Sequence, residues 1–172
     1  MQVLYGIGGG IAAYKAPEVV RALARAGHSV RCVVTASGSR LVAGDALAAV
    51  SGAKVATTMW PGDGSMPHIE LARWCDALLV APATADLLAR FALGLADDLL
   101  TTLFLALEPA KRVVLAPAMN TVMWQKPVVQ GHVATLRAAG ARIVAPVAGD
   151  LACGETGVGA MAPPEAMIAA LA

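Results

Sequence analysis

The chain has 172 residues and a formal net charge of +1, with 58% hydrophobic and 15% charged residues. This length predicts one domain over residues 1–172 with a substantial core, and the lack of a basic excess argues against nucleic acid as a partner. No apolar run approaches the ~20 residues needed to cross a bilayer, and the first residues lack the features of a secretory signal, so we expect no membrane partner.

The first part of the chain contains a glycine-rich turn between an apolar strand and a helix. We expect a strand at Gln2–Tyr5, the turn at 6–10 and a helix from about Ile11 to Ala26. Such an arrangement presents backbone N–H groups and the positive end of a helix dipole to an anion. A plain tight turn is the alternative interpretation.

The details of this turn favour a mononucleotide over a dinucleotide. The third glycine of the dinucleotide fingerprint would fall at position 11, which is Ile11. The second expected strand, Ser29–Val34, is followed by Thr35 and Ser37 and lacks the acidic residue that binds a ribose hydroxyl. Because two hydroxyls suit a terminal phosphate, the sequence predicts a mononucleotide site here.

Helices and strands alternate through the rest of the chain. Apolar runs of strand length, bounded by glycine and proline, predict three further strands. The glycine-rich stretch Gly149–Met161 is expected to be a functional loop, since it is too long for a simple connection. We expect strands at Ala77–Ala81, Arg112–Leu115 and Arg142–Pro146, and helices near 41–50, at Pro67–Trp74, near 85–94, and at Ala96–Leu107, Pro127–Ala139 and Pro164–Leu171.

Five short strands alternating with helices predict the α/β class. The expected fold is a single Rossmann-like (flavodoxin-like) doubly wound parallel sheet with helices on both faces. Three strands are followed by residues typical of turns, at Gly8–Gly10, Thr84–Asp86 and Pro117–Asn120. Ligands of open α/β sheets bind at the carboxyl ends of the strands, so we expect the site there.

Three polar residues are candidates for chemistry. Asn120 lies just past the strand that ends at Pro117 and offers two donors and an acceptor, although it could simply cap the next helix. His68 opens a helix and can exchange protons near neutral pH, although it could be an ordinary exposed histidine. Cys153 lies in the glycine-rich stretch and is the best candidate for a reactive thiol.

The remaining cysteines and acids have simpler interpretations. Cys32 and Cys75 are expected in the core, and an odd number of widely spaced cysteines predicts neither a disulfide framework nor a zinc site. A reducing, cytoplasmic environment is therefore expected. Asp97 and Asp98 are expected to open a helix, as its cap and as acidic residues that interact favourably with its dipole.

Six short stretches, each at or near an expected strand end, helix start or loop, resemble one family. They are GGIAAYK (9–15), HIELARW (68–74), APATA (81–85), LADDLL (95–100), APAMN with MW (116–120 and 123–124), and ACGE with GVGAM (152–155 and 157–161). The chain resembles the homo-oligomeric flavin-containing cysteine decarboxylases from about Val3 to Glu165. The resemblance is greatest to the phosphopantothenoylcysteine decarboxylases of coenzyme A biosynthesis.

The resemblance implies a homotrimer, or a homododecamer of four trimers, with FMN bound between subunits. His68 would be the catalytic base, Asn120 would hold the substrate carboxylate and Cys153 would donate a proton. Arg73 and Met119 would lie near the substrate. The implied FMN-binding residues are Gly9, Gly10, Ile11, Thr35, Ser37, Thr84, Ala85, Asp86 and Ala118.

The implied reaction oxidises a cysteinyl thiol to a thioaldehyde, after which CO₂ is lost and an enethiol forms. Cys153 favours phosphopantothenoylcysteine as the substrate, because it could serve a subsequent reduction of the enethiol. The expectation that the chain ends with the decarboxylase unit favours the alternative, a peptide with a C-terminal cysteine. A non-catalytic FMN-binding regulatory subunit is a more distant alternative. Asp86 stands where many members have asparagine, which leaves its role open.

Overall fold

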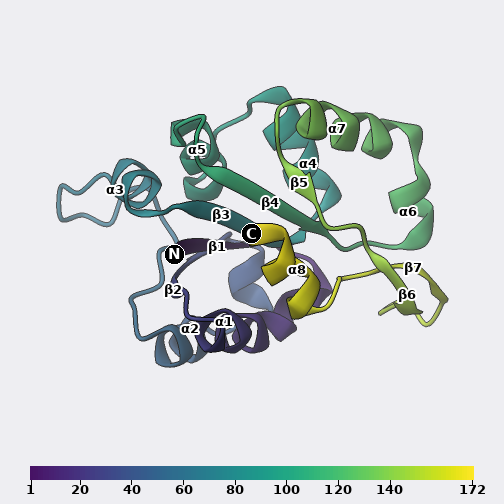
Figure 1. The fold of residues 1–172 in the computed structure, drawn as a ribbon, viewed down its shortest axis with the longest axis horizontal. Coiled ribbons are helices and arrows are strands. Elements are labelled where there is room, and N and C mark those ends of the chain that lie inside the picture. The colour runs from purple at the N-terminus through teal and green to yellow at the C-terminus, as the bar shows by residue number, and fades with distance from the viewer.

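A computed structural model describes residues 1–172 and contains a five-stranded parallel sheet in the order β2-β1-β3-β4-β5 (Figure 1). Every pairing in this sheet is parallel, and consecutive parallel strands are connected by helices, which confirms the predicted doubly wound α/β fold. The strands are β1 Gln2–Ile7, β2 Ser29–Val34, β3 Ala77–Ala83, β4 Arg112–Pro117 and β5 Arg142–Ile143.

Helices cover both faces of the sheet, and the two faces have separate cores (Figure 1). Alternate residues of β1 point to opposite faces: Val3 and Tyr5 pack with α1, α2 and α8, whereas Leu4 packs with α3, α4, α5 and α7. The helices are α1 Ala16–Arg25, α2 Gly44–Ser51, α3 Pro67–Trp74, α4 Ala85–Leu93, α5 Leu99–Ala106, α6 Thr121–Gln125, α7 Pro127–Ala138 and α8 Pro164–Leu171. None of them combines the length and apolarity needed to cross a membrane.

Several boundaries differ from those expected. The expected helix from Ile11 to Ala26 is a 3₁₀ segment, Ile11–Lys15, followed by α1, whose first turn contains Pro17. Proline favours the first turn of an α-helix because it has no N–H group to leave unbonded there. The helix expected from Ala96 begins instead at Leu99, because Asp98 is its N-cap.

The sheet is short at one edge and partly covered at the other. The strand expected at Arg142–Pro146 pairs with β4 at only two residues, Arg142 and Ile143. At the opposite edge, Val33 of β2 forms an isolated parallel bridge with Ala56. Both edge strands therefore present few unpaired backbone N–H and C=O groups.

The expectation of a loop at Gly149–Met161 is wrong. This segment forms most of an antiparallel hairpin of β6 Val147–Asp150 and β7 Thr156–Ala160, seen at the right of Figure 1 beside α6. The short helix α6 follows Asn120, where a helix capped by this residue was one of the two interpretations. The hairpin and α6 extend the carboxyl edge of the sheet beyond the ends of β3 and β4.

Candidate functional site

The carboxyl ends of β1, β2 and β3 enclose a cavity of about 430 Å³. Five of the residues expected to bind a cofactor line it, and they come from three different strand ends. The parallel pairing of these strands accounts for this convergence, because all of their carboxyl ends meet at one edge. The lining residues are Gly9, Thr35, Ala36, Ser37, Thr84, Asp86, Leu87, Arg90, Asp97 and Asp98.

The turns after β1 and β2 lie so close together that one of them requires glycine. A Cβ atom added to Gly9 would lie 2.2 Å from Cβ of Ser37, far inside van der Waals contact. The Thr35 hydroxyl braces this approach, since it donates to the Ile7 carbonyl oxygen at 3.2 Å and accepts from the Gly38 N–H at 3.0 Å. The exposed Ser37 hydroxyl has no partner within the chain, so it is available to a ligand.

The third side of the cavity is the N-terminus of α4. Thr84 is the N-cap of this helix, and its Oγ1 accepts a hydrogen bond from the Leu87 N–H at 3.2 Å. The unpaired N–H groups and positive dipole end of the first turn face the same strand edge as Gly9. Phosphate binds readily where a helix N-terminus and a glycine turn converge.

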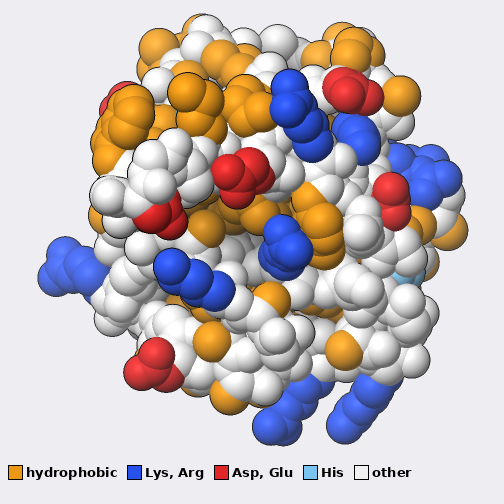
Figure 2. Space-filling model, turned by 90° about the vertical axis from the view of Figure 1, so that its left-hand side faces the viewer, with side chains coloured by type: hydrophobic (Ala, Val, Ile, Leu, Met, Phe, Trp, Pro, Cys, Tyr) orange, Lys and Arg blue, Asp and Glu red, His pale blue; other side chains and the backbone are white.

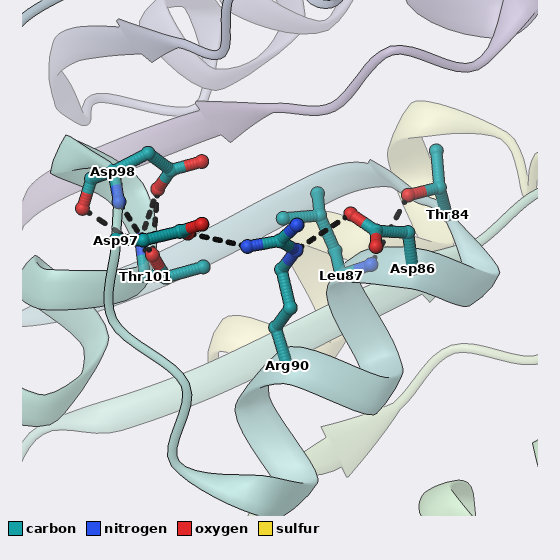
Figure 3. Close-up of polar contacts among 7 residues, drawn as sticks. All are labelled: Thr84, Asp86, Leu87, Arg90, Asp97, Asp98 and Thr101. Atoms are coloured by element: carbon teal, nitrogen blue, oxygen red, sulfur yellow. Dashed lines mark hydrogen bonds and ion pairs between the residues drawn. The ribbon is translucent and has the colours of Figure 1, made fainter.

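Arg90 lies between two carboxylates inside this cavity (Figure 3). Its Nε donates to Asp86 Oδ2 at 2.9 Å, and its Nη1 donates to Asp97, which connects α4 to the segment before α5. This hydrogen bond to Asp97 raises the pKa of Arg90 above its usual value, and the same contact lowers the pKa of Asp97. Arg90 therefore joins the two segments that form one wall of the cavity.

The charges divide the cavity into two parts. Asp86, Asp97 and Asp98 contribute three carboxylates to the lining, two of them paired with the Arg90 guanidinium, whereas the turns that contain Gly9 and Ser37 contribute no acidic side chain. A phosphate would be repelled by the first part and accepted by N–H and O–H donors in the second. The acidic part suits hydroxyl and N–H donors of a ligand. The residues present thus fit a mononucleotide with its phosphate at the neutral part.

Asp97 and Asp98 were expected to be cap and dipole residues at the start of a helix, and Asp98 is the cap. Asp98 Oδ1 accepts from the Thr101 N–H at 2.7 Å, and the Thr101 hydroxyl accepts from the Asp98 N–H, which completes a capping box. Asp97 instead forms an ion pair with Arg90. The difference arises because the chain before Asp98 passes beside α4, where Arg90 can reach it (Figure 3).

A second polar cluster lies beyond β4, where the hairpin tip meets α6. Asn120 is the N-cap of α6, since its Oδ1 accepts from the Val122 N–H at 2.8 Å. Its Nδ2 donates to Glu155 Oε2 at 2.9 Å and lies 3.5 Å from Cys153 Sγ. The Cys153 thiol in turn lies 3.5 Å from Glu155 Oε2. The structure therefore brings two of the expected catalytic residues together.

Two glycines of β7 let the hairpin approach this cluster. A Cβ atom added to Gly159 would lie 2.1 Å from the Met119 carbonyl oxygen, and one added to Gly157 would lie 2.4 Å from Thr121 Oγ1. The Met119 N–H donates to the Gly159 carbonyl oxygen at 3.0 Å, which fixes the hairpin against the turn after β4. This packing holds Cys153 beside Asn120.

Other expected residues lie outside the cavity. Gly10, Ile11, Ala85 and Ala118 are absent from its lining, and the side chain of Ile11 is 57% exposed. His68 and the exposed Arg73 are on α3, which packs on α5 at the far side of the molecule from α6 and the hairpin (Figure 1). His68 Nδ1 is buried and has no hydrogen-bond partner. One chain alone does not bring His68 to Asn120 and Cys153.

Sequence reasoning missed Arg90 and Glu155. Arg90 is four residues after Asp86, the spacing at which helical side chains pair, so that ion pair could have been anticipated. Glu155 is 35 residues from Asn120, and no local pattern indicates their contact. The three cysteines lie as expected, with Cys32 and Cys75 buried and Cys153 exposed.

Comparisons with known proteins identify the family. Residues 1–172 match the family described as Flavoprotein. The coenzyme A biosynthesis bifunctional protein CoaBC of Mycobacterium bovis is 48% identical over 166 residues, which are 96% of this chain and 38% of that protein. This chain thus spans well under half the length of that relative.

Two solved structures are similar over nearly all of both chains. One is a PPC decarboxylase mutant complexed with pantothenoylaminoethenethiol, with a TM-score of 0.85 and 34% identity over 95% of this chain and 92% of that chain. The other is the FMN-dependent cysteine decarboxylase SpaF, with a TM-score of 0.83 and 35% identity over 100% of this chain and 98% of that chain. The chain belongs to the Flavoprotein family.

Proposed function

We propose that this member of the Flavoprotein family is an FMN-dependent decarboxylase of a cysteinyl carboxylate, with phosphopantothenoylcysteine as its substrate. The observation that carries the proposal is the pairing, at one sheet edge, of a mononucleotide cavity with the Asn120–Cys153 cluster. The similarity to CoaBC and to the PPC decarboxylase structure supports the substrate, and SpaF supports the cofactor. Residues 1–172 form one such flavoprotein domain.

FMN would be held by residues that the cavity already gathers. The phosphate would accept hydrogen bonds from the Ser37 hydroxyl and from N–H groups of the Gly9 turn and the α4 N-terminus. Thr35 would act by bracing Ser37 and Gly9, because its own hydroxyl is already bonded. Asp86 and its neighbours would accept from ligand hydroxyls. Gly10, Ile11 and Ala85 lie within two residues of a cavity residue in the chain, and the Ala118 N–H donates to the carbonyl oxygen of Ala83, which precedes Thr84; these four remain proposed contacts.

The chemistry requires an electron acceptor and three positioned side chains. When bound, FMN supplies reversible hydride transfer with the carbon that bears sulfur, which gives the departing carboxylate an electron sink. His68 would take the thiol proton as this carbon is oxidised. Asn120 would hold the carboxylate without a positive charge that would oppose its loss. Cys153 would return a proton, while Met119 and Arg73 lie beside the substrate.

The separation of His68 from Asn120 within one chain supports a site shared between copies. Large hydrophobic side chains are exposed on several elements, and on the face in Figure 2, which is the side of α3, the apolar area gathers toward the top, where α5 lies. A second copy would cover this area and bring its His68 to the site. We propose a trimer, alone or as a dodecamer. The exposed side chains are Ile11, Tyr14, Leu93, Leu95, Leu105, Val122 and Met123.

A peptide with a C-terminal cysteine is the alternative substrate. An enzyme that releases an enethiol needs no proton donor, so the position of Cys153 beside Asn120 favours the small molecule, whose product is reduced again. A non-catalytic FMN-binding subunit would need neither Asn120 nor Cys153 in these contacts. The exposed free thiol also fits a reducing, cytoplasmic setting.

Incubation of the purified protein with each substrate, followed by mass spectrometry of the products, tests the proposal. The expected outcome is a loss of CO₂ from phosphopantothenoylcysteine and formation of the saturated aminothiol. A product two mass units lighter, formed only from the peptide, would establish the alternative. A protein that neither binds FMN nor releases CO₂ from either compound would refute the proposed function.

A further inference from the structure

The tip of the β6–β7 hairpin places a carboxylate on the amide that is proposed to bind the substrate. The Leu151 N–H donates to the Glu155 carbonyl oxygen at 2.8 Å, and the Gly154 N–H donates to the Leu151 carbonyl oxygen at 2.9 Å. Gly154 closes this turn with a φ of 83°, in the left-handed region that favours glycine. The turn directs Cys153 and Glu155 together at Asn120.

The Asn120 amide has no free donor in this arrangement. Its oxygen caps α6 through the Val122 N–H. Its Nδ2 donates one hydrogen bond to Glu155 Oε2 at 2.9 Å and a longer one to Cys153 Sγ at 3.5 Å. An amide nitrogen has two hydrogens, so a substrate carboxylate can bind Asn120 only if Glu155 leaves. Two carboxylates on one donor would also repel each other.

We propose that Glu155 is a positioning residue that exchanges with the substrate carboxylate on Asn120, and that this exchange brings Cys153 to the substrate only after CO₂ has left. The inference rests on the proposed function and deepens it. In the substrate complex Asn120 holds the substrate carboxylate, and Glu155 and the hairpin tip are displaced. Loss of CO₂ frees the amide, and Glu155 returns to it together with Cys153.

The balance of the second half-reaction explains why this order matters. The enethiol would gain one hydride at the carbon bearing sulfur, which the bound FMN would supply, and one proton at the carbon that lost CO₂. Cys153 gives that proton and its thiolate recovers one from water. The carbon that lost CO₂ lies where the carboxylate was bound, next to the Asn120 amide. In the structure Cys153 lies 3.5 Å from that amide while Glu155 occupies it, and in the proposed exchange the two residues arrive and leave together.

A Glu155→Ala variant separates this role from a structural one. Without its competitor the substrate carboxylate should bind more tightly, so KM should fall about threefold to tenfold, in line with one charge-assisted hydrogen bond. Release of CO₂ in a first anaerobic turnover should stay within about twofold of wild type. The product should shift from saturated thiol to enethiol by about tenfold or more. Glu155→Gln, which retains an acceptor, should restore part of the saturated product.

A general loosening of the site would instead raise KM and slow CO₂ release together. The matched control is Glu108→Ala, an exposed glutamate whose side chain makes no hydrogen bond or ion pair and which is far from the hairpin in sequence. It should leave KM and the product ratio unchanged. An unchanged product ratio in Glu155→Ala, or a raised KM, would overturn the inference.

A readout without substrate tests the resting contact directly. Cys153 is the exposed cysteine and Cys32 and Cys75 are buried, so alkylation of the native flavin-loaded protein by iodoacetamide reports on Cys153. Glu155→Ala should be alkylated severalfold faster than wild type and Glu108→Ala. Equal rates would overturn the inference even if the protein is a decarboxylase. If the wild type releases no CO₂, the proposed function fails, whereas this comparison still shows whether Glu155 holds the thiol.

Discussion

Substitution of Gly9 by alanine should weaken FMN binding while leaving the fold intact. The new Cβ atom would lie 2.2 Å from Cβ of Ser37, and the two turns would have to separate until the atoms reach the 3.4 Å of ordinary contact. Gly9 has a negative φ, so alanine adds no backbone strain, and the cost is one of overpacking, about 1–3 kcal/mol. Since 1.4 kcal/mol is tenfold in affinity, FMN should bind about 10–100-fold more weakly.

The assay is a titration of the apoprotein with FMN, followed by quenching of flavin fluorescence, with thermal unfolding measured in parallel. The control is Gly131→Ala in the middle of α7, where an added Cβ meets nothing within 4 Å. Alanine there should leave FMN affinity unchanged and raise stability by about 0.5–1 kcal/mol. If Gly9→Ala binds FMN as tightly as the wild type does, the phosphate is not held between the β1 and β2 turns.

Three other outcomes follow from the site. His68→Asn should retain FMN but lose about 10²–10⁴-fold in decarboxylation, and normal turnover would place the base elsewhere. The bond from Arg90 lowers the pKa of Asp97, so this carboxylate stabilises the fold above its unfolded pKa, near 3.9, and the contribution is lost as the pH falls through the lower folded pKa. Asp97→Asn weakens this bond in the cavity wall, so the variant should release FMN more readily at neutral pH. Equal retention of FMN would contradict this role. Burial raises the pKa of Cys32 to about 12, so native alkylation at pH 8 should modify Cys153 and leave Cys32 unmodified, as peptide mapping by mass spectrometry can check.

The sheet could be predicted because its strands are almost wholly buried. All seven residues of β3 are buried, so the run appears in the sequence as continuous apolar residues bounded by breakers. The turns after β1 and β2 were likewise recognisable from glycine and hydroxyl residues. These parts depend on local sequence and on one general rule about parallel sheets.

The hairpin could not be predicted because the role of its glycines is tertiary. Gly157 and Gly159 permit close approach to Thr121 and Met119, residues distant in the chain. In the sequence alone such glycines indicate flexibility, which led to the expectation of a loop. The contact of Glu155 with Asn120 escaped prediction for the same reason, and His68 can meet them only through a packing that one chain does not contain.

The edges of the sheet constrain how copies of this chain can associate. A strand with an open ladder can pair with the same strand of another molecule, which leads to continuous sheets or to aggregation. Here the edge strand β5 is only two residues long. At the other edge Ala56 already pairs with β2, because it accepts from the Val34 N–H and donates to the Cys32 carbonyl oxygen, both at 3.0 Å. Backbone-mediated pairing through the edges of the five-stranded sheet is therefore limited. In the proposed trimer, contacts across this sheet would therefore be made by side-chain surfaces, whose shapes would limit the number of subunits.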